Sequence, residues 1–172
     1  MNTLRITSGK YRGRVISTPG GKTHPMGERE RLALFNMIAS YLPEAIVLDA
    51  FAGSGALGIE ALSRGAARAV FVEKDSGACR VIRDNLAILG ENSEVDQLDI
   101  SNYTSDTRFD VILADPPYDS FSLAAVQKLV KLLSKEGILV LSHPGEAPEI
   151  AGLKCEKSRT YAGATISTYV KI

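Results

Sequence analysis

The chain has only two cysteines, Cys79 and Cys155, in 172 residues. Two cysteines this far apart form neither a disulfide framework nor the spacing of a metal site, so we expect reduced thiols and no bound metal. No apolar run approaches the ~20 residues that a membrane span requires. The first ten residues lack the apolar core of a signal peptide. These absences predict a cytoplasmic protein with no membrane contact.

The chain also lacks net charge, because 20 basic residues balance 20 acidic ones. The balance is uneven, since residues 1–31 carry a net charge of +5 and the remainder −5. A basic arm on an acidic body indicates a polyanionic partner. The charge alone fits equally well with a hairpin whose charges are simply solvated. The basic residues of this arm are Arg5, Lys10, Arg12, Arg14, Lys22, Arg29 and Arg31.

Strand and helix patterns alternate after Pro43, which predicts an α/β fold with a parallel sheet covered on both faces. The expected strands are 45–49, 69–72, 94–98, 109–114 and 137–141, and the expected helices are 56–64, 75–89 and 123–133. The polar strand 94–98 is expected near an edge. Residues 4–18 are typical of a small hairpin, 19–25 of a loop, 29–41 of an amphipathic helix, and 153–160 with 164–171 of an antiparallel pair.

A glycine-rich segment, residues 49–58, follows the first of these strands and opens a helix, which is the context of a nucleotide-binding loop. Glu73 ends the next strand, where it can accept hydrogen bonds from ribose hydroxyls. The glycine pattern by itself would also serve NAD, but Asp49 at the strand tip would repel a pyrophosphate and suits a cation such as S-adenosylmethionine. Asp99 is placed to meet an adenine amino group. The candidates for cofactor binding are Asp49, Phe51, Gly53, Ser54, Gly55, Glu73 and Asp99.

The run Asp115-Pro116-Pro117-Tyr118 follows the apolar strand 109–114 and indicates a site for a planar amine. The Asp115 carboxylate and the Pro116 carbonyl can accept the two N–H groups of an exocyclic amine and aim its lone pair at a methyl donor. The prolines keep these acceptors rigid, because their φ is locked and they have no competing N–H. Tyr118 can stack on the base, a contact worth roughly 1–3 kcal/mol. The base would have to be unpaired or flipped out to enter.

Together these motifs resemble one known family. Residues 49–65 with Asp115–Tyr118 are similar to the bacterial 16S rRNA guanine-N2 methyltransferases of the RsmD type, which are class I S-adenosylmethionine enzymes. The likeness runs nearly end to end, because residues 8–14 are similar to the family's basic hairpin and residues 161–169 to its last hairpin. The family's Arg-Pro-Thr-x-x-Asp run appears here as His24-Pro25-Met26-Gly27-Glu28-Arg29, a departure that concerns RNA contacts of this loop.

The resemblance implies a Rossmann-like, mostly parallel seven-stranded sheet with an antiparallel last strand and helices on both faces, plus a small N-terminal hairpin and helix. Residues 1–28 would form the basic hairpin and loop, and 29–172 the methyltransferase domain. A monomer would transfer a methyl group from S-adenosylmethionine to one guanine of 16S rRNA, free or in the small ribosomal subunit. The implied catalytic residues are Asp115, Pro116, Pro117 and Tyr118, and the implied RNA-binding residues are Lys10, Arg12 and Arg14.

Three other functions fit parts of the pattern. A DNA adenine or cytosine amino methyltransferase could use the same motif, but this chain shows no separate target-recognition domain. A non-catalytic RNA-binding or ribosome-assembly protein of the same fold would explain the altered loop at residues 24–28. An NAD-dependent oxidoreductase would use the glycine loop, yet no acid or base for hydride transfer is evident.

Overall fold

The fold is known from a computed structural model, which describes residues 2–21 and 25–172. Lys22 and His24, two residues of the N-terminal loop discussed above, lie outside the described residues. Within the two described ranges, no helix is long and apolar enough to cross a lipid bilayer.

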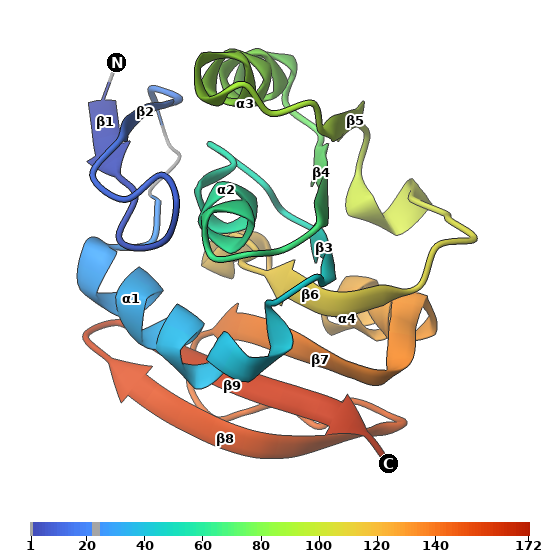
Figure 1. The fold of residues 1–172 in the computed structure, drawn as a ribbon. Coiled ribbons are helices and arrows are strands. Elements are labelled where there is room, and N and C mark those ends of the chain that lie inside the picture. The colour runs from blue at the N-terminus through green and yellow to red at the C-terminus, as the bar shows by residue number, and fades with distance from the viewer. Residues whose placement is uncertain (1, 22–24) are drawn as a thin grey trace.

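A seven-stranded sheet in the order β5-β4-β3-β6-β7-β9-β8 forms the centre of the molecule (Figure 1). Neighbours from β5 through β7 pair in parallel, whereas β9 pairs antiparallel with both β7 and β8. The last strand is therefore the antiparallel one, and β5 lies at an edge, as expected. The strands are β3 (Ile46–Asp49), β4 (Arg68–Glu73), β5 (Glu94–Gln97), β6 (Phe109–Ala114), β7 (Leu133–His143), β8 (Leu153–Tyr161) and β9 (Ala164–Lys171).

Helices cover both faces of the sheet (Figure 1). Three of them pack their buried residues into the core of one face, for example Phe35, Ile59 and Ile82, whereas the fourth contributes Val126 and Leu129 to the core of the other face. The α-helices are α1 (Glu28–Met37), α2 (Ala56–Ser63), α3 (Ser76–Leu89) and α4 (Leu123–Leu129), and the short 3-10 helices are η1 (Ala39–Tyr41), η2 (Ile100–Asn102), η3 (Tyr118–Ser120) and η4 (Val130–Leu132).

The N-terminal hairpin, made of β1 (Asn2–Arg5) and β2 (Val15–Thr18), packs on α2 instead of projecting into solvent. Its side chains Ile6 and Ile16 are buried in the same core as Ile59 and Leu62 of α2. Every residue of α2 is buried, because the sheet lies on one side of the helix and the hairpin and α1 on the other. A largely apolar helix, interrupted here only by Glu60 and Ser63, is the expected sequence signature of such a position.

A buried cluster of charges joins the hairpin and α1 to α2. The Glu60 carboxylate, 0% exposed, accepts hydrogen bonds from the backbone N–H groups of Thr7 (2.9 Å) and Ser8 (3.2 Å). It also pairs with Arg64 (3.2 Å) and with the Nε of Arg31 (3.5 Å). Arg31 is 1% exposed and donates to the Arg5 carbonyl at 2.6 Å. Arg31 therefore adds nothing to a basic surface, although its charge was counted in the arm.

The boundary between α4 and β7 differs from the expected one. The helix ends at Leu129, η4 follows, and β7 begins at Leu133, four residues before the predicted strand start. The pairing of β6 with β7 shifts register between Phe109 and Val111. A Cβ at Gly137 would lie 2.8 Å from the Leu133 Cδ1 and 3.0 Å from the Asp110 carbonyl oxygen. Gly137 thus marks an irregularity inside the strand, where the backbones approach closely, and not the strand's beginning.

Candidate functional site

Polar side chains from several strands meet at the carboxyl edge of the sheet. Asp49 ends β3, Glu73 ends β4, and Asp115 follows β6. The order of the strands reverses between β3 and β6, and open α/β sheets bind their ligands in the crevice at such a point. The charges of Glu73 and Asp115 both act to raise the pKa of Asp49. The fold therefore brings three of the predicted site residues close enough for their charges to interact.

Asp49 is fully buried beneath the glycine-rich loop. Its Oδ2 accepts the backbone N–H of Gly58 at 2.9 Å, while Oδ1 has no hydrogen-bond partner among the described residues. Burial is the main cause that raises the pKa of Asp49 to about 8; the Gly58 hydrogen bond opposes this rise, and the nearby Asp115 and Glu73 add to it. An unsatisfied buried carboxylate oxygen is costly unless a donor or a positive charge comes to it.

The loop that follows Asp49 depends on its glycines. Gly53 and Gly55 adopt positive φ values of 55° and 81°, which glycine adopts without steric cost. At Gly58 a Cβ would lie 2.3 Å from the Cε1 of Phe71, so only glycine lets α2 approach β4 this closely. Gly58 was not among the predicted site residues, although it is the third glycine of the G-x-G-x-x-G pattern and could have been found from it.

Glu73 stabilises this loop through hydrogen bonds. Its Oε2 accepts the Gly53 N–H at 2.8 Å and its Oε1 accepts the Asp75 N–H at 3.0 Å. Each carboxylate oxygen has a further lone pair, so the half-buried side chain can still accept bonds from a ribose. Asn85, which the sequence analysis missed, ties the loop to the hairpin by donating to the carbonyls of Ser54 (3.1 Å) and Ser17 (2.9 Å).

The other three predicted cofactor contacts have different surroundings. Phe51 is partly buried against the core on the α4 face. Ser54 is buried, and its hydroxyl accepts the Ala56 N–H at 3.3 Å. Asp99 is exposed after β5 and caps η2 by accepting the Ser101 N–H at 2.9 Å, a bond that lowers the pKa of Asp99. Part of the hydrogen-bonding capacity of Asp99 is thus used within its own turn.

The Asp115–Tyr118 motif continues β6 into η3 at the same edge of the sheet. Asp115 and Tyr118 are half-buried, Pro116 is buried and Pro117 is exposed. Burial raises the pKa of Asp115 to about 6, and the Ser142 hydroxyl holds it below the value that burial alone would produce. The Tyr118 hydroxyl forms a hydrogen bond with Ser142, near the end of β7. Asp115 is therefore mostly ionised at neutral pH and can accept hydrogen bonds from an amine.

The predicted RNA-binding residues lie away from this edge. The backbone N–H of Lys10 donates to the carbonyl of Ser63, the last residue of α2, at 2.8 Å. The eight residues of α2 rise about 12 Å, so the hairpin tip and the glycine-rich loop lie at opposite ends of this helix. Lys10 pairs with Glu91 at 3.0 Å, Arg14 donates to the Ile88 carbonyl at 3.2 Å, and Arg12 is exposed.

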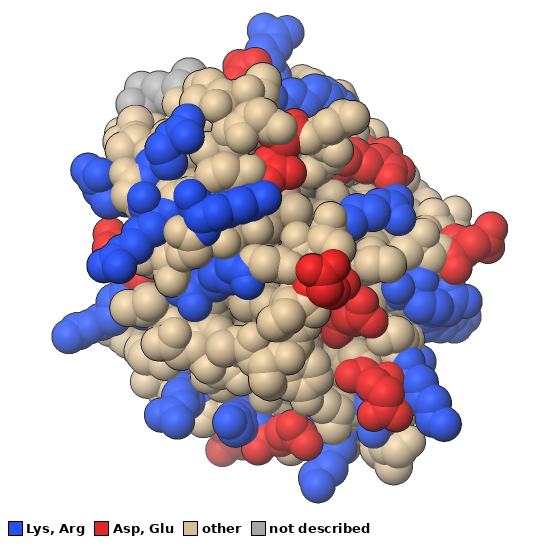
Figure 2. All heavy atoms as spheres, in the orientation of Figure 1, with Lys and Arg blue, Asp and Glu red and all other residues tan. Residues whose placement is uncertain are grey.

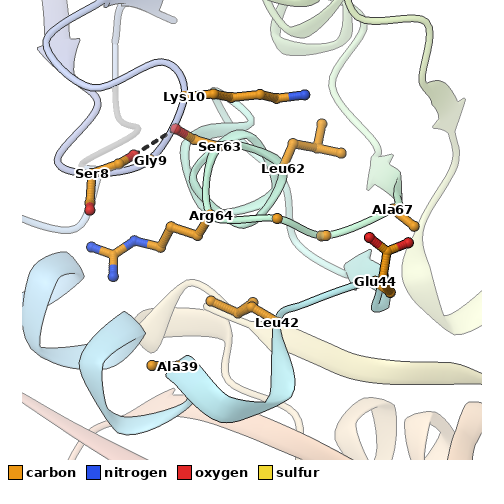
Figure 3. A pocket seen from close by; sticks show the side chains of 12 residues that line it. Ser8, Gly9, Lys10, Ala39, Leu42, Glu44, Leu62, Ser63, Arg64 and Ala67 are labelled. Carbon is orange, nitrogen blue, oxygen red and sulfur yellow. Dashed lines mark hydrogen bonds between the residues drawn. The ribbon is translucent and has the colours of Figure 1, made fainter.

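The surface around the hairpin is nonetheless basic. Figure 2 shows Lys and Arg side chains gathered on the left flank, over the hairpin and the start of α1, with few acidic side chains among them. A hollow of about 610 Å³ opens beside this flank at the carboxyl end of α2. Lys10 reaches across the helix end there, and Arg64 turns toward α1 (Figure 3). The fold thus separates a basic flank from the acidic edge that contains Asp49 and Asp115.

Among the described residues, no group of three or more His, Cys, Asp or Glu side chains has the arrangement to hold a metal ion. Both cysteines are free, with Cys79 buried and Cys155 exposed. His143 is buried at the end of β7, and its Nε2 lies 2.8 Å from the Ser167 hydroxyl.

Comparisons with known proteins identify a matching family model and several similar proteins. A family model described as "Conserved hypothetical protein 95" matches residues 4–170. The chain is 34% identical to YlbH of Bacillus subtilis over 98% of this chain and 99% of that protein. It is 36% identical to ribosomal RNA small subunit methyltransferase D of Escherichia coli K12 over 79% of this chain and 69% of that protein. The solved structure of Escherichia coli yhhF superposes with a TM-score of 0.89 at 31% identity and covers 99% of this chain and 98% of that one.

Proposed function

Because the chain belongs to the RsmD family of ribosomal RNA small subunit methyltransferases, we propose that it methylates the exocyclic 2-amino group of a guanine in 16S rRNA with S-adenosylmethionine as the donor. The observation that carries this proposal is the meeting of Asp49, Glu73 and the Asp115 motif at one edge of the sheet. This edge offers acceptors for a cation and for an amine side by side.

The residues of the glycine-rich loop fit S-adenosylmethionine, which supplies a methyl group on a positively charged sulfur when it is bound. The unpartnered Oδ1 of Asp49 is a buried acceptor that a cationic ligand would stabilise. Glu73 would hold the ribose, and Asp99 would meet the adenine amino group. The positive-φ glycines Gly53 and Gly55 keep side chains out of the loop, so its backbone can approach the ligand.

The Asp115 motif would hold the target base. Asp115 and the Pro116 carbonyl would accept the two N–H bonds of the amine, which draws the nitrogen toward a tetrahedral shape and directs its lone pair. Such positioning can supply much of a rate enhancement. The nitrogen would form one new bond to the methyl carbon while the bond from that carbon to sulfur breaks and leaves its electron pair on sulfur, and the nitrogen must then lose one proton. Asp115, with a pKa of about 6, can take that proton and release it to water.

The function can be tested with small-subunit particles from a strain that lacks the gene. With tritiated S-adenosylmethionine, we expect the purified protein to label guanine in 16S rRNA and to leave particles from the parent strain unlabelled. Label on duplex DNA in preference to rRNA would favour a DNA amino methyltransferase. Binding of the donor without label on any ribosomal substrate would favour a non-catalytic assembly protein.

The buried Asp49 predicts how donor binding depends on pH. Its pKa of about 8 means that the site holds a proton at neutral pH, and a sulfonium favours the ionised carboxylate. Affinity for S-adenosylmethionine should therefore rise by up to about tenfold per pH unit below pH 8 and level off above it. Calorimetry between pH 6 and 9 would measure this. S-adenosylhomocysteine, which lacks the charge on sulfur, is the matched ligand and should show a shallower rise.

The same two ligands also test whether Asp49 is the group that responds to the sulfonium. In Asp49→Asn, which keeps the size of the side chain but cannot ionise, the difference in slope between the two ligands should disappear. Parallel curves for both ligands in the unmodified protein would show that Asp49 does not respond to the sulfonium.

The basic hairpin predicts a salt effect on RNA binding. The double replacement Arg12→Ala and Arg14→Ala should weaken binding and reduce the slope of log affinity against log salt concentration by roughly one to two, since each lost phosphate contact removes nearly one unit. Filter binding at several salt concentrations measures this slope. Lys131→Ala with Lys135→Ala removes the same charge from exposed positions at η4 and the start of β7. Equal slopes for the two double variants would mean that the hairpin does not contact RNA.

A further inference from the structure

Ser142 carries a buried hydroxyl at the end of the apolar half of β7. It follows four buried hydrophobic residues, 138–141, on β7 and is itself 2% exposed. A buried hydroxyl costs stability unless it has a hydrogen-bond partner. Its partner is the hydroxyl of Tyr118, which belongs to the Asp115 motif on another part of the chain. This contact joins β7 to the Asp115–Tyr118 motif.

The pairing of β6 with β7 explains why Ser142 reaches this motif. Ala114 pairs with Leu141, so the next residues of the two strands, Asp115 and Ser142, continue side by side beyond the end of β6. Side chains alternate along a strand, and Ile138 and Val140 are buried in the core of the α2 face. Ser142 thus projects on the face that carries the glycine-rich loop.

We propose that Ser142 is a positioning residue for methyl transfer: its hydroxyl accepts a hydrogen bond from the Tyr118 hydroxyl and donates one to the Asp115 carboxylate. One side chain of β7 then fixes both the aromatic ring that stacks on the base and the carboxylate that accepts its amine. This inference rests on the proposed function, and it adds a residue that lies outside the Asp-Pro-Pro-Tyr motif. A hydroxyl can donate one hydrogen bond and accept others, so both contacts are compatible with the chemistry of serine.

The electrostatics of Asp115 agree with this arrangement. Burial raises the pKa of Asp115 to about 6, and the Ser142 hydroxyl opposes that rise. Two other ionisable groups face Asp115: the buried Asp49 on β3 and the Tyr118 phenol on η3. His143, the next residue on β7, is bonded to Ser167 instead. Ser142 is therefore the side chain of β7 that lowers the pKa of Asp115 and favours its ionised form.

Turnover of two single variants and their combination tests the proposal. Ser142→Ala and Tyr118→Phe should each lower kcat by roughly five- to fiftyfold, with little change in the KM for the donor, because each leaves one hydrogen-bonding partner free. The double variant should be no slower than the slower single variant, because both changes remove the same contact. Independent, multiplying effects would overturn the proposed link between Ser142 and Tyr118.

A matched control lies on the same strand. Ser134, at the other end of β7, also bonds to β6, through Asp110 at 3.3 Å. Ser134→Ala should leave kcat and its pH profile unchanged. In Ser142→Ala the acid limb of the pH profile, expected near pH 6, should move to higher pH by about half a unit or more, because Asp115 loses a donor to its ionised form. Ser142→Thr, which keeps the hydroxyl, should restore the original limb. An unmoved limb in Ser142→Ala would overturn the proposal.

An NMR titration separates this inference from the proposed function. The carboxyl carbon-13 signal of Asp115 reports its pKa in the protein without substrate or donor. The pKa of Asp115 should rise in Ser142→Ala and stay unchanged in Ser134→Ala, whatever nucleic acid the protein methylates. A shifted pKa together with no label on rRNA would reject the substrate and keep the role of Ser142. An unchanged pKa would reject the role of Ser142 even if rRNA is labelled.

Discussion

Asp115→Asn should lower the methylation rate by roughly 10²–10⁴-fold and leave the affinity for S-adenosylmethionine within a few-fold of the original. The amide has nearly the shape of the carboxylate, but its NH₂ group would meet the N–H of the amine with another donor. It also cannot take the proton that the methylated nitrogen must lose. Single-turnover rates with small-subunit particles, together with calorimetry for the donor, measure the two quantities separately.

The neighbouring Asp119 provides the control for this variant. It is an exposed acid four residues further on, in η3, so Asp119→Asn changes the same charge outside the buried site. Its rate should stay near that of the unmodified protein. A tenfold loss of donor affinity in Asp115→Asn would instead place Asp115 in the donor site. The pKa of about 6 adds a pH prediction: activity should fall by about tenfold per unit as pH drops below 6, because protonated Asp115 is a poor acceptor for the N–H of the amine.

Glu60→Gln should lower the free energy of unfolding by about 3–5 kcal/mol, the loss typical when one partner of a buried ion pair is removed. The change leaves the guanidinium of Arg31, which is 1% exposed, without an opposing charge. It also weakens the acceptor that holds the backbone of Thr7 and Ser8 on α2. Urea unfolding would measure the loss, and amide hydrogen exchange should show the hairpin opening before the sheet.

An exposed ion pair in the same molecule is the natural comparison. Arg68 and Glu94 pair at 3.1 Å with about half of each side chain exposed. Glu94→Gln should therefore change the free energy of unfolding by about 1 kcal/mol or less. If Glu60→Gln cost no more than Glu94→Gln, the buried cluster would not hold the hairpin in place.

Local patterns along the chain were enough to predict the main elements and the two motifs. Alternating strand and helix periodicity predicted the parallel sheet, and the structure confirms it with β9 as the antiparallel strand. The predicted helix 75–89 matches α3, because Asp75 caps its start and the left-handed Gly90 ends it, and both signals depend on neighbouring residues alone. The end of α4 was predicted less well, because the register shift at Gly137 depends on contacts with another strand.

The sequence by itself determined the fold class, the glycine-rich loop and the Asp115 motif, because each depends on residues close together in the chain. Only the tertiary structure decided what the charged side chains face. It buried Arg31 against Glu60, placed Lys10 at the far end of α2 from the loop, and set Ser142 against Tyr118. These contacts join residues that are distant in sequence. Which of them form depends on burial and on strand register, and no local sequence pattern encodes either.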